Sequence, residues 1–284
     1  MSQQIPDSEL IVNSDGSVYH LGILPEQLPE FIFLVGDPER VPMVSAHFET
    51  IHSQIHKREF ITHIGTHQGK PLAVISTGIG GDNIDIVLNE LNLLRNANLK
   101  TRKWNEKRAN LTLVRLGTSG AIHSGLVMDS FLASKSATGL DGLAWYYTDD
   151  NSYLDEAFIS VTNWSKRKNS PYLVSGSQKL LELLPEQIYQ GKTLTCSGFY
   201  RPQGRTLYGE IDQSLNAKTL ESAGIDNLEM ETAALYFLAK EFGFDALSLN
   251  VLLANRADGT FSQCPHESIE ALIKKGFELF FPPA

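Results

Sequence analysis

Cysteine is scarce in this chain of 284 residues, and long hydrophobic runs are absent. The two cysteines, Cys196 and Cys264, are too few for a disulfide framework and lack the spacing of metal ligands, so we expect free thiols and no metal cluster. No apolar run is long enough to cross a bilayer, and the first residues lack the basic and apolar regions of a signal peptide. These absences predict a cytoplasmic protein.

Positive charge is also in short supply. The chain has 24 lysines and arginines against 33 aspartates and glutamates, a net charge of −9, which argues against nucleic acid or a membrane as a partner. Its one basic stretch, residues 100–108, is interrupted by Trp104 and Glu106 and is typical of an exposed loop. An anionic substrate would therefore have to be bound by individual arginines.

What the chain does contain is an alternation of short apolar runs with segments of helical spacing. No repeat, low-complexity tract or linker divides it, so we expect one domain over residues 1–284, with residues 1–17 as an N-terminal extension. The alternation predicts an α/β fold in which helices flank a central mixed β-sheet. Expected strands cover residues 31–35, 71–76, 111–116, 130–134, 193–197 and 246–253; expected helices cover 84–94 and 230–238, the second ending at Gly243; residues 58–77 are expected to form a hairpin.

Two of the expected strand ends carry candidate anion-binding residues. A Gly-Asp-Pro turn at residues 36–38 leads into a helix-like segment, where backbone N–H groups and the guanidinium of Arg40 favour an anion, although such a turn is more often only a turn. Arg115 lies in a buried-looking strand and needs a carboxylate or a bound anion as partner. Thr118 follows it with a hydroxyl beside flexible glycines, so the two strand ends together predict an oxyanion pocket.

Several other features have plain structural interpretations. The glycine-rich segment 76–81 fits neither a dinucleotide-binding fingerprint nor a nucleoside-triphosphate loop, so neither of these enzyme classes is supported. Glu229 and Glu231 precede an apolar helix and could simply favour its N-terminus. Two histidine pairs with i,i+4 spacing lie in strand-like segments, where such positions are far apart, which argues against a metal site.

Taken together, five motifs resemble those of the nucleoside phosphorylases of the purine and uridine phosphorylase superfamily. They occur in the family's order and approximate spacing, over about residues 18–281. The resemblance implies a single α/β domain with a partly barrel-like central sheet, which catalyses the reversible phosphorolysis of a ribonucleoside. The motifs are Gly36-Asp37-Pro38-Glu39-Arg40, Arg58-Glu59-Phe60, Ser76-Thr77-Gly78-Ile79-Gly80-Gly81, Arg115-Leu116-Gly117-Thr118-Ser119-Gly120 and Glu229-Met230-Glu231.

The resemblance also implies a role for each matching residue. Phosphate would attack the anomeric carbon as the bond to the base breaks, and Glu231 would accept hydrogen bonds from the 2′- and 3′-hydroxyls of the ribose. The implied phosphate ligands are Gly36, Arg40, Arg115, Thr118 and, from a neighbouring subunit, Arg58; the implied ribose ligands are Glu229, Met230, Glu231 and, reaching across an interface to the 5′-hydroxyl, His20.

Residues 199–205 resemble the uracil-binding stretch of the uridine-specific members. Phe199 would pack near the sugar and base, while Gln203 and Arg205 would hydrogen-bond the acceptor, donor and acceptor groups of the pyrimidine edge. With Arg115 and Glu231, these two residues are the expected catalytic groups. Purine-specific members carry an aspartate after the late strand, where residues 252–256 here read Leu-Leu-Ala-Asn-Arg. The resemblance thus implies cleavage of uridine to uracil and ribose 1-phosphate in pyrimidine salvage.

The same resemblance has implications for cofactors and assembly. Inorganic phosphate would be a co-substrate and no cofactor would be needed, although some members hold a structural potassium ion at a dimer interface, here near Glu59, Ile79 and Asn83. Shared active sites imply a homodimer, with a homohexamer as the preferred multiple. Two features depart from the family: Leu228 stands where members often have Tyr, and residues 99–110 and 144–172 look longer than in the bacterial enzymes.

Three alternatives to this function stay open at the level of sequence. A purine nucleoside phosphorylase or a nucleosidase would share the fold, although a hydrolase does not require so many phosphate arginines. A non-catalytic nucleoside-binding protein would have no evident need for both phosphate and ribose ligands. The sequence does not distinguish uridine from thymidine or deoxyuridine as the substrate.

Overall fold

A closed ring of five strands lies at the centre of the computed structural model, which describes residues 4–207, 209–210 and 212–283. β7 (Thr112–Ala121) pairs in parallel with β12 (Asp245–Asn255) and antiparallel with β11 (Asn227–Glu229). β8 (Phe131–Gly139) pairs antiparallel with β12, and β10 (Tyr189–Thr195) joins β8 to β11 through parallel ladders. Each of the five strands therefore has a partner on both sides.

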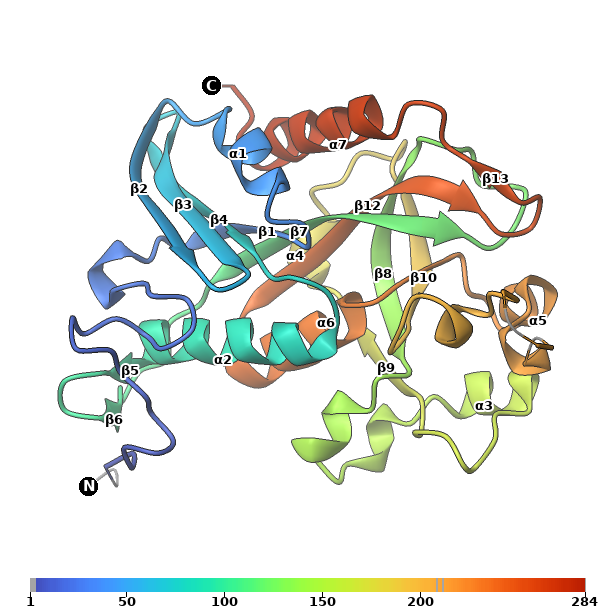
Figure 1. Ribbon diagram of the computed structural model, residues 1–284, viewed down its shortest axis with the longest axis horizontal. Helices are drawn as coiled ribbons and strands as arrows, with labels where there is room; N and C mark the ends of the chain where they lie inside the picture. Colours follow the sequence, from blue (N-terminus) through green and yellow to red (C-terminus); the bar gives the residue numbers. More distant parts are fainter. Residues whose placement is uncertain (1–3, 208, 211, 284) are drawn as a thin grey trace.

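The sheet continues from this ring through β1 (Phe31–Val35), which pairs in parallel with both β7 and β4 (Lys70–Ser76). β3 (Phe60–His67) and β2 (Thr50–Lys57) follow as antiparallel neighbours. Two short strands complete the sheet: β9 (Tyr172–Ser175) pairs with β8, and β13 (Thr260–Phe261) with β12. This mixed, partly closed sheet with helices around it confirms the predicted α/β fold (Figure 1).

Helices cover both faces of the sheet where β1 passes through it (Figure 1). α2 (Gly81–Asn96) packs against α6 (Thr232–Phe242) on one face, whereas α7 (Pro265–Phe280) and α1 (Arg40–Ser45) lie on the other. Strand β1 follows the period of two that this arrangement requires. Ile32 and Leu34 belong to the hydrophobic cluster under α2 and α6, while Phe33 and Val35 belong to the cluster under α1 and α7.

The remaining elements are short and lie in the connections. Residues 99–110 and 144–172 were expected to be longer than in the bacterial enzymes. The first segment begins in a two-stranded hairpin, and the second contains two 3₁₀ turns and one helix. These short elements are η1 (Pro25–Gln27), β5 (Ala97–Asn98), β6 (Lys103–Trp104), η2 (Leu143–Tyr146), η3 (Asn151–Tyr153), α3 (Glu156–Thr162), α4 (Gln178–Leu181), η4 (Arg201–Gln203), η5 (Gln213–Leu215) and α5 (Ala217–Ser222). No helix within the described ranges is long and apolar enough to span a membrane.

The N-terminal extension does not stand apart from the core. Residues 4–17 of this segment are described, and residues 1–3 lie outside the described residues. Leu10 is fully buried, and so is Val18 just beyond the extension; both belong to the hydrophobic cluster that contains the apolar face of α2.

Three of the strands predicted from the sequence had wrong boundaries. The strand expected to end at residue 134 is β8, which runs to Gly139, and the strand expected over 193–197 is β10, which covers Tyr189–Thr195. The strand starting near residue 111 was expected to end at Leu116, but β7 continues to Ala121. The glycine-rich residues 117–120 suggest a turn, yet they pair with β12 along their whole length, and Gly120 also pairs with Leu228 of β11. Backbone pairing on both sides therefore outweighs the weak strand propensity of glycine.

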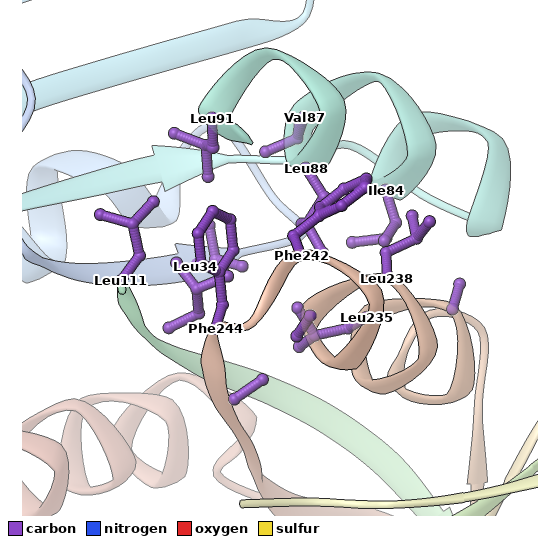
Figure 2. Close-up of a cluster of buried hydrophobic side chains, with 14 of the residues drawn as sticks. Leu34, Ile84, Val87, Leu88, Leu91, Leu111, Leu235, Leu238, Phe242 and Phe244 are labelled. Carbon is purple, nitrogen blue, oxygen red and sulfur yellow. The ribbon is translucent and has the colours of Figure 1, made fainter. Parts of the chain in front are cut away.

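Leu88 is fully buried where α2 meets α6 (Figure 2). We expect Leu88→Ala to lower the free energy of unfolding by about 2–5 kcal/mol, because it leaves a cavity in this cluster. Leu183→Ala is the control, since 54% of Leu183 is exposed, and it should change stability by less than about 0.5 kcal/mol. Urea unfolding at one protein concentration measures both, and equal losses would contradict the assignment.

Candidate functional site

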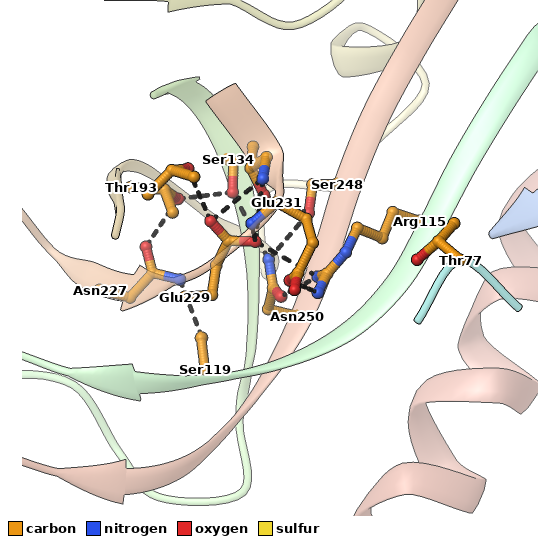
Figure 3. A network of polar contacts seen from close by, with 12 residues as sticks. Thr77, Arg115, Ser119, Ser134, Thr193, Asn227, Glu229, Glu231, Ser248 and Asn250 are labelled. Carbon is orange, nitrogen blue, oxygen red and sulfur yellow. Dashed lines mark hydrogen bonds and ion pairs between the residues drawn. The ribbon is translucent and has the colours of Figure 1, made fainter. Parts of the chain in front are cut away.

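Arg115 on β7 is the centre of a buried polar network (Figure 3). It is only 4% exposed. Its Nη2 bonds the carboxylate of Glu231, and its Nη1 donates to Oδ1 of Asn250 at 3.1 Å and lies 3.6 Å from Oε2 of Glu229. Gly117 makes room for this side chain, since a Cβ there would lie 1.8 Å from Nη1 of Arg115. The carboxylates provide the partners that a buried guanidinium requires.

A second buried guanidinium lies beside the first. Arg40, the first residue of α1, is 8% exposed, and its Nη1 donates to the carbonyl of Leu116 at 3.1 Å. Burial, followed by the positive charge of Arg115, lowers the pKa of Arg40 to about 10. Arg115 is paired with carboxylates, whereas among the described residues Arg40 has a backbone carbonyl as its side-chain partner, so the guanidinium of Arg40 keeps donors that suit an anion.

The other two expected phosphate ligands lie at the same edge of the sheet. Gly36 directly follows β1, and Thr118 lies on β7 two positions beyond the carbonyl that Arg40 binds. The parallel register of β1 and β7 sets Leu34 opposite Arg115, so the end of β1 meets residues 116–118. The structure thus brings Gly36, Arg40, Arg115 and Thr118 together from the end of β1, the start of α1 and β7.

The two expected ribose glutamates have different surroundings. Glu229 accepts the backbone N–H groups of Glu231 at 2.9 Å and Thr232 at 3.0 Å, and the hydroxyl of Thr195 at 2.7 Å. Its carboxylate therefore caps the start of α6, the structural interpretation that the sequence left open. Glu231 instead accepts the N–H of Gly80, at 2.8 Å, and pairs with Arg115. Met230 lies half-buried between them.

Among the three expected base-binding residues, Arg205 contacts the other two. Nη1 of Arg205 donates to Oε1 of Gln203 at 2.7 Å, and its guanidinium lies 3.7 Å from the ring centre of Phe199. Gln203 is 4% exposed, whereas half of Phe199 is accessible. Burial, and next the charge of Arg256, lowers the pKa of Arg205. The segment therefore presents donors and an aromatic ring from one rigid turn.

Sequence reasoning missed Arg256 as a candidate for the same site. Its Nη1 is buried and has no hydrogen-bond partner among the described residues. With Gln203 and Leu228 it lines a small cavity of about 90 Å³, and burial lowers its pKa. A buried N–H without a partner favours a ligand that carries an acceptor. The available signal was an arginine three residues after the apolar run 246–253, in the stretch where purine-specific members carry an aspartate.

The longer segment 144–172 borders this base-binding segment. Trp164 and residues 167–169 line a cavity of about 630 Å³ together with Gly204 and Arg205. This volume is within the range of small-molecule sites. The segment therefore shapes the surroundings of Arg205 rather than only lengthening a loop.

His20 and Arg58 lie together in a different place. The ring centre of Tyr19 is 4.8 Å from that of His20 and 5.6 Å from the guanidinium of Arg58, which occupies the turn between β2 and β3. Within the described chain, neither side chain hydrogen-bonds Arg115 or Glu231. The two residues expected to act on a neighbouring subunit thus form one surface cluster.

The residues expected near a potassium ion also come together. A Cβ at Gly78 would lie 2.4 Å from Nδ2 of Asn83 and 3.7 Å from Cγ of Glu59, and Nδ2 of Asn83 donates to the carbonyl of Ile79 at 3.4 Å. Over the described residues, no group of three His, Cys, Asp or Glu is arranged to hold a metal ion. Both cysteines are free thiols, as expected.

Comparisons with known proteins identify the family of the chain. The family model of the phosphorylase superfamily matches residues 30–277. A uridine phosphorylase of Thermococcus kodakarensis is 29% identical over 93% of this chain and 86% of its own. A DeoD-type purine nucleoside phosphorylase of Alkaliphilus metalliredigens is 28% identical over 92% of this chain and 98% of its own. A solved Trypanosoma brucei nucleoside phosphorylase, described as showing uridine phosphorylase activity, has a TM-score of 0.81 at 25% identity, covering 94% and 97% of the two chains. Because the uridine and purine relatives are almost equally identical to this chain, these comparisons do not show whether its substrate carries a pyrimidine or a purine base.

We expect inorganic phosphate to raise the melting temperature of the protein, because an anion between Arg40 and Arg115 binds only the folded state. Arg40→Met should abolish this increase and change the melting temperature without phosphate little, since it removes a buried charge beside a like charge. Arg95→Met, which removes a guanidinium paired with Glu30 near the surface, is the control and should keep the increase. A phosphate effect that survives Arg40→Met would contradict the anion site.

Proposed function

The chain belongs to the phosphorylase superfamily, and from this premise we propose that it is a uridine phosphorylase. The reaction is the reversible phosphorolysis of uridine: an oxygen of inorganic phosphate bonds C1′ of the ribose, and the bond from C1′ to N1 breaks with its electron pair on uracil. The products are uracil and ribose 1-phosphate. This proposal gives a role to the arginines at the expected phosphate site, to Glu231 at the expected ribose site and to the base-binding segment 199–205.

The observation that carries the choice of base is the donor set around Gln203. Arg205 contacts Gln203, and Arg256 lines the adjoining cavity with an Nη1 that has no hydrogen-bond partner among the described residues. No carboxylate is among the described residues that line that cavity. Uracil has two carbonyl acceptors that guanidinium donors fit, and its charge grows as the bond breaks. A purine leaving group would instead gain from an acid that protonates it, which this donor set lacks.

The phosphate end of the site has a separate set of charges. Arg40 and Arg115 would hold phosphate next to C1′ of the ribose. Phosphate attacks this carbon directly, so no covalent bond to the protein forms. Glu231 would face the ribose while its pairing with Arg115 keeps the carboxylate fixed. Phosphate and Glu231 together offset the positive charge that develops on the ribose in the transition state.

We further propose that the active sites are completed between subunits. His20 and Arg58 form one surface cluster around Tyr19, separate from Arg115 and Glu231. A homodimer in which each chain offers this cluster to the other is the simplest assembly that brings them to a ribose and a phosphate. A homohexamer would be a multiple of that dimer.

A panel of nucleosides tests the proposed reaction. Uridine should release uracil only when phosphate is present, and inosine and adenosine should be poor substrates; thymidine and deoxyuridine in the same panel measure the preference for the sugar and the 5-methyl group. Base release can be followed by ultraviolet absorbance. Equal rates with and without phosphate would refute phosphorolysis, and rapid cleavage of inosine with none of uridine would refute the base assignment.

The two ends of the site should respond differently to mutation. Arg205→Ala should lower kcat for uridine about 10²- to 10³-fold with little effect on the KM for phosphate, because it removes a donor that acts as charge develops on uracil. Arg40→Met should instead raise the KM for phosphate, which is charged throughout the reaction. Steady-state kinetics with each substrate varied measure both. The same pattern in both variants would contradict this division.

A further inference from the structure

Glu90 is a buried carboxylate on the apolar face of α2. It is 7% exposed and is surrounded in the helix by Val87, Leu88, Leu91 and Leu94, which all belong to the hydrophobic core. A carboxylate in such a place is costly unless its oxygens accept several hydrogen bonds. Helix formation alone does not explain why a carboxylate occupies this buried position.

Within the described part of the chain, the three hydrogen bonds of the Glu90 carboxylate all go to the segment that carries His20. Oε1 accepts the backbone N–H of His20 at 2.7 Å and lies 2.8 Å from Nδ1 of its imidazole, and Oε2 accepts the backbone N–H of Leu21 at 2.8 Å. An ionised carboxylate can only accept, so Nδ1 must carry the proton. Nε2 of a neutral His20 is then the acceptor of the ring, on a side chain that is 28% exposed.

The position of Glu90 along α2 separates this pair from the site of its own chain. Gly80, at the start of α2, contacts Glu231. Ten residues of helix separate Gly80 from Glu90, which corresponds to about 15 Å along the axis at 1.5 Å per residue. His20 is thus held beyond the middle of α2, away from the end of the helix that contacts Glu231 of the same chain. The residue before α2 therefore contacts Glu231, whereas Glu90 on the same helix holds His20 at a separate place.

We propose that Glu90 is a positioning residue that fixes His20 in the Nδ1–H tautomer, so that Nε2 accepts a hydrogen bond from the 5′-hydroxyl of a nucleoside bound in a neighbouring subunit. This inference rests on the proposed function. The competing role for Glu90 is purely structural, in which it anchors the chain around residues 20 and 21 through the two backbone N–H groups.

The choice of substrate separates the two roles. 5′-Deoxyuridine lacks the hydroxyl that Nε2 would bind. A variant that has a lower kcat/KM for this substrate has therefore lost activity through a change in structure and not through loss of that hydrogen bond. We expect Glu90→Gln to lower the ratio of kcat/KM for uridine to kcat/KM for 5′-deoxyuridine about tenfold, the effect of one lost hydrogen bond. His20→Asn should lower the ratio to the same extent, and the double variant should lower it no further.

Asp85→Asn is the matched control, because it removes a carboxylate from the same helix that bonds Tyr147 and Asn89 and not His20. This variant should leave the ratio unchanged. If Glu90→Gln lowers the use of both substrates equally, Glu90 only anchors the chain and the positioning role is wrong.

A measurement without substrate keeps the inference separate from the proposed function. In protein labelled with ¹⁵N-histidine, at a pH where the imidazole is neutral, the His20 resonances, assigned with His20→Asn, should be those of the Nδ1–H tautomer and should change in Glu90→Gln. An Nε2–H tautomer in the native protein would overturn the positioning role. Failure of the native protein to cleave uridine would instead refute the proposed function.

Discussion

The buried ion pair between Arg115 and Glu231 joins three parts of the fold at one point. Arg115 comes from β7, Glu231 precedes α6, and the same carboxylate accepts the N–H of Gly80 at the start of α2. Removing one partner of such a pair leaves a buried charge, at a cost of about 3–5 kcal/mol. The position of both helices against the sheet therefore depends on the contact that lies at the centre of the proposed chemistry.

The local excess of arginine explains how an acidic chain can bind phosphate. The protein carries a net charge of −9, yet Arg40 lies against Arg115, and Arg205 lies near Arg256. Burial lowers the pKa of Arg40, Arg205 and Arg256, although only Arg40 among these three is a buried residue and the other two are partly exposed. In a site with little water, such charges act on a bound anion with little screening.

The family and the framework of the sheet could be predicted from the sequence because they depend on local patterns. The run 31–35 became β1 without change, and the hairpin at 58–77 formed as expected. The roles of Glu229 and Arg256 could not be predicted in the same way. Whether a carboxylate caps a helix or faces a ligand depends on which backbone N–H groups lie beside it, and an arginine without a partner is recognisable only once its surroundings are known.

Base choice is a property of a few side chains that the fold does not determine. A uridine phosphorylase and a purine nucleoside phosphorylase are about equally similar to this chain over nearly its whole length, so overall similarity does not assign the base. The difference must then lie where the base would sit, between Gln203, Arg205 and Arg256. Three donors from two segments far apart in sequence converge there, and a leaving group that accumulates negative charge on its carbonyl oxygens uses such donors better than one that must be protonated.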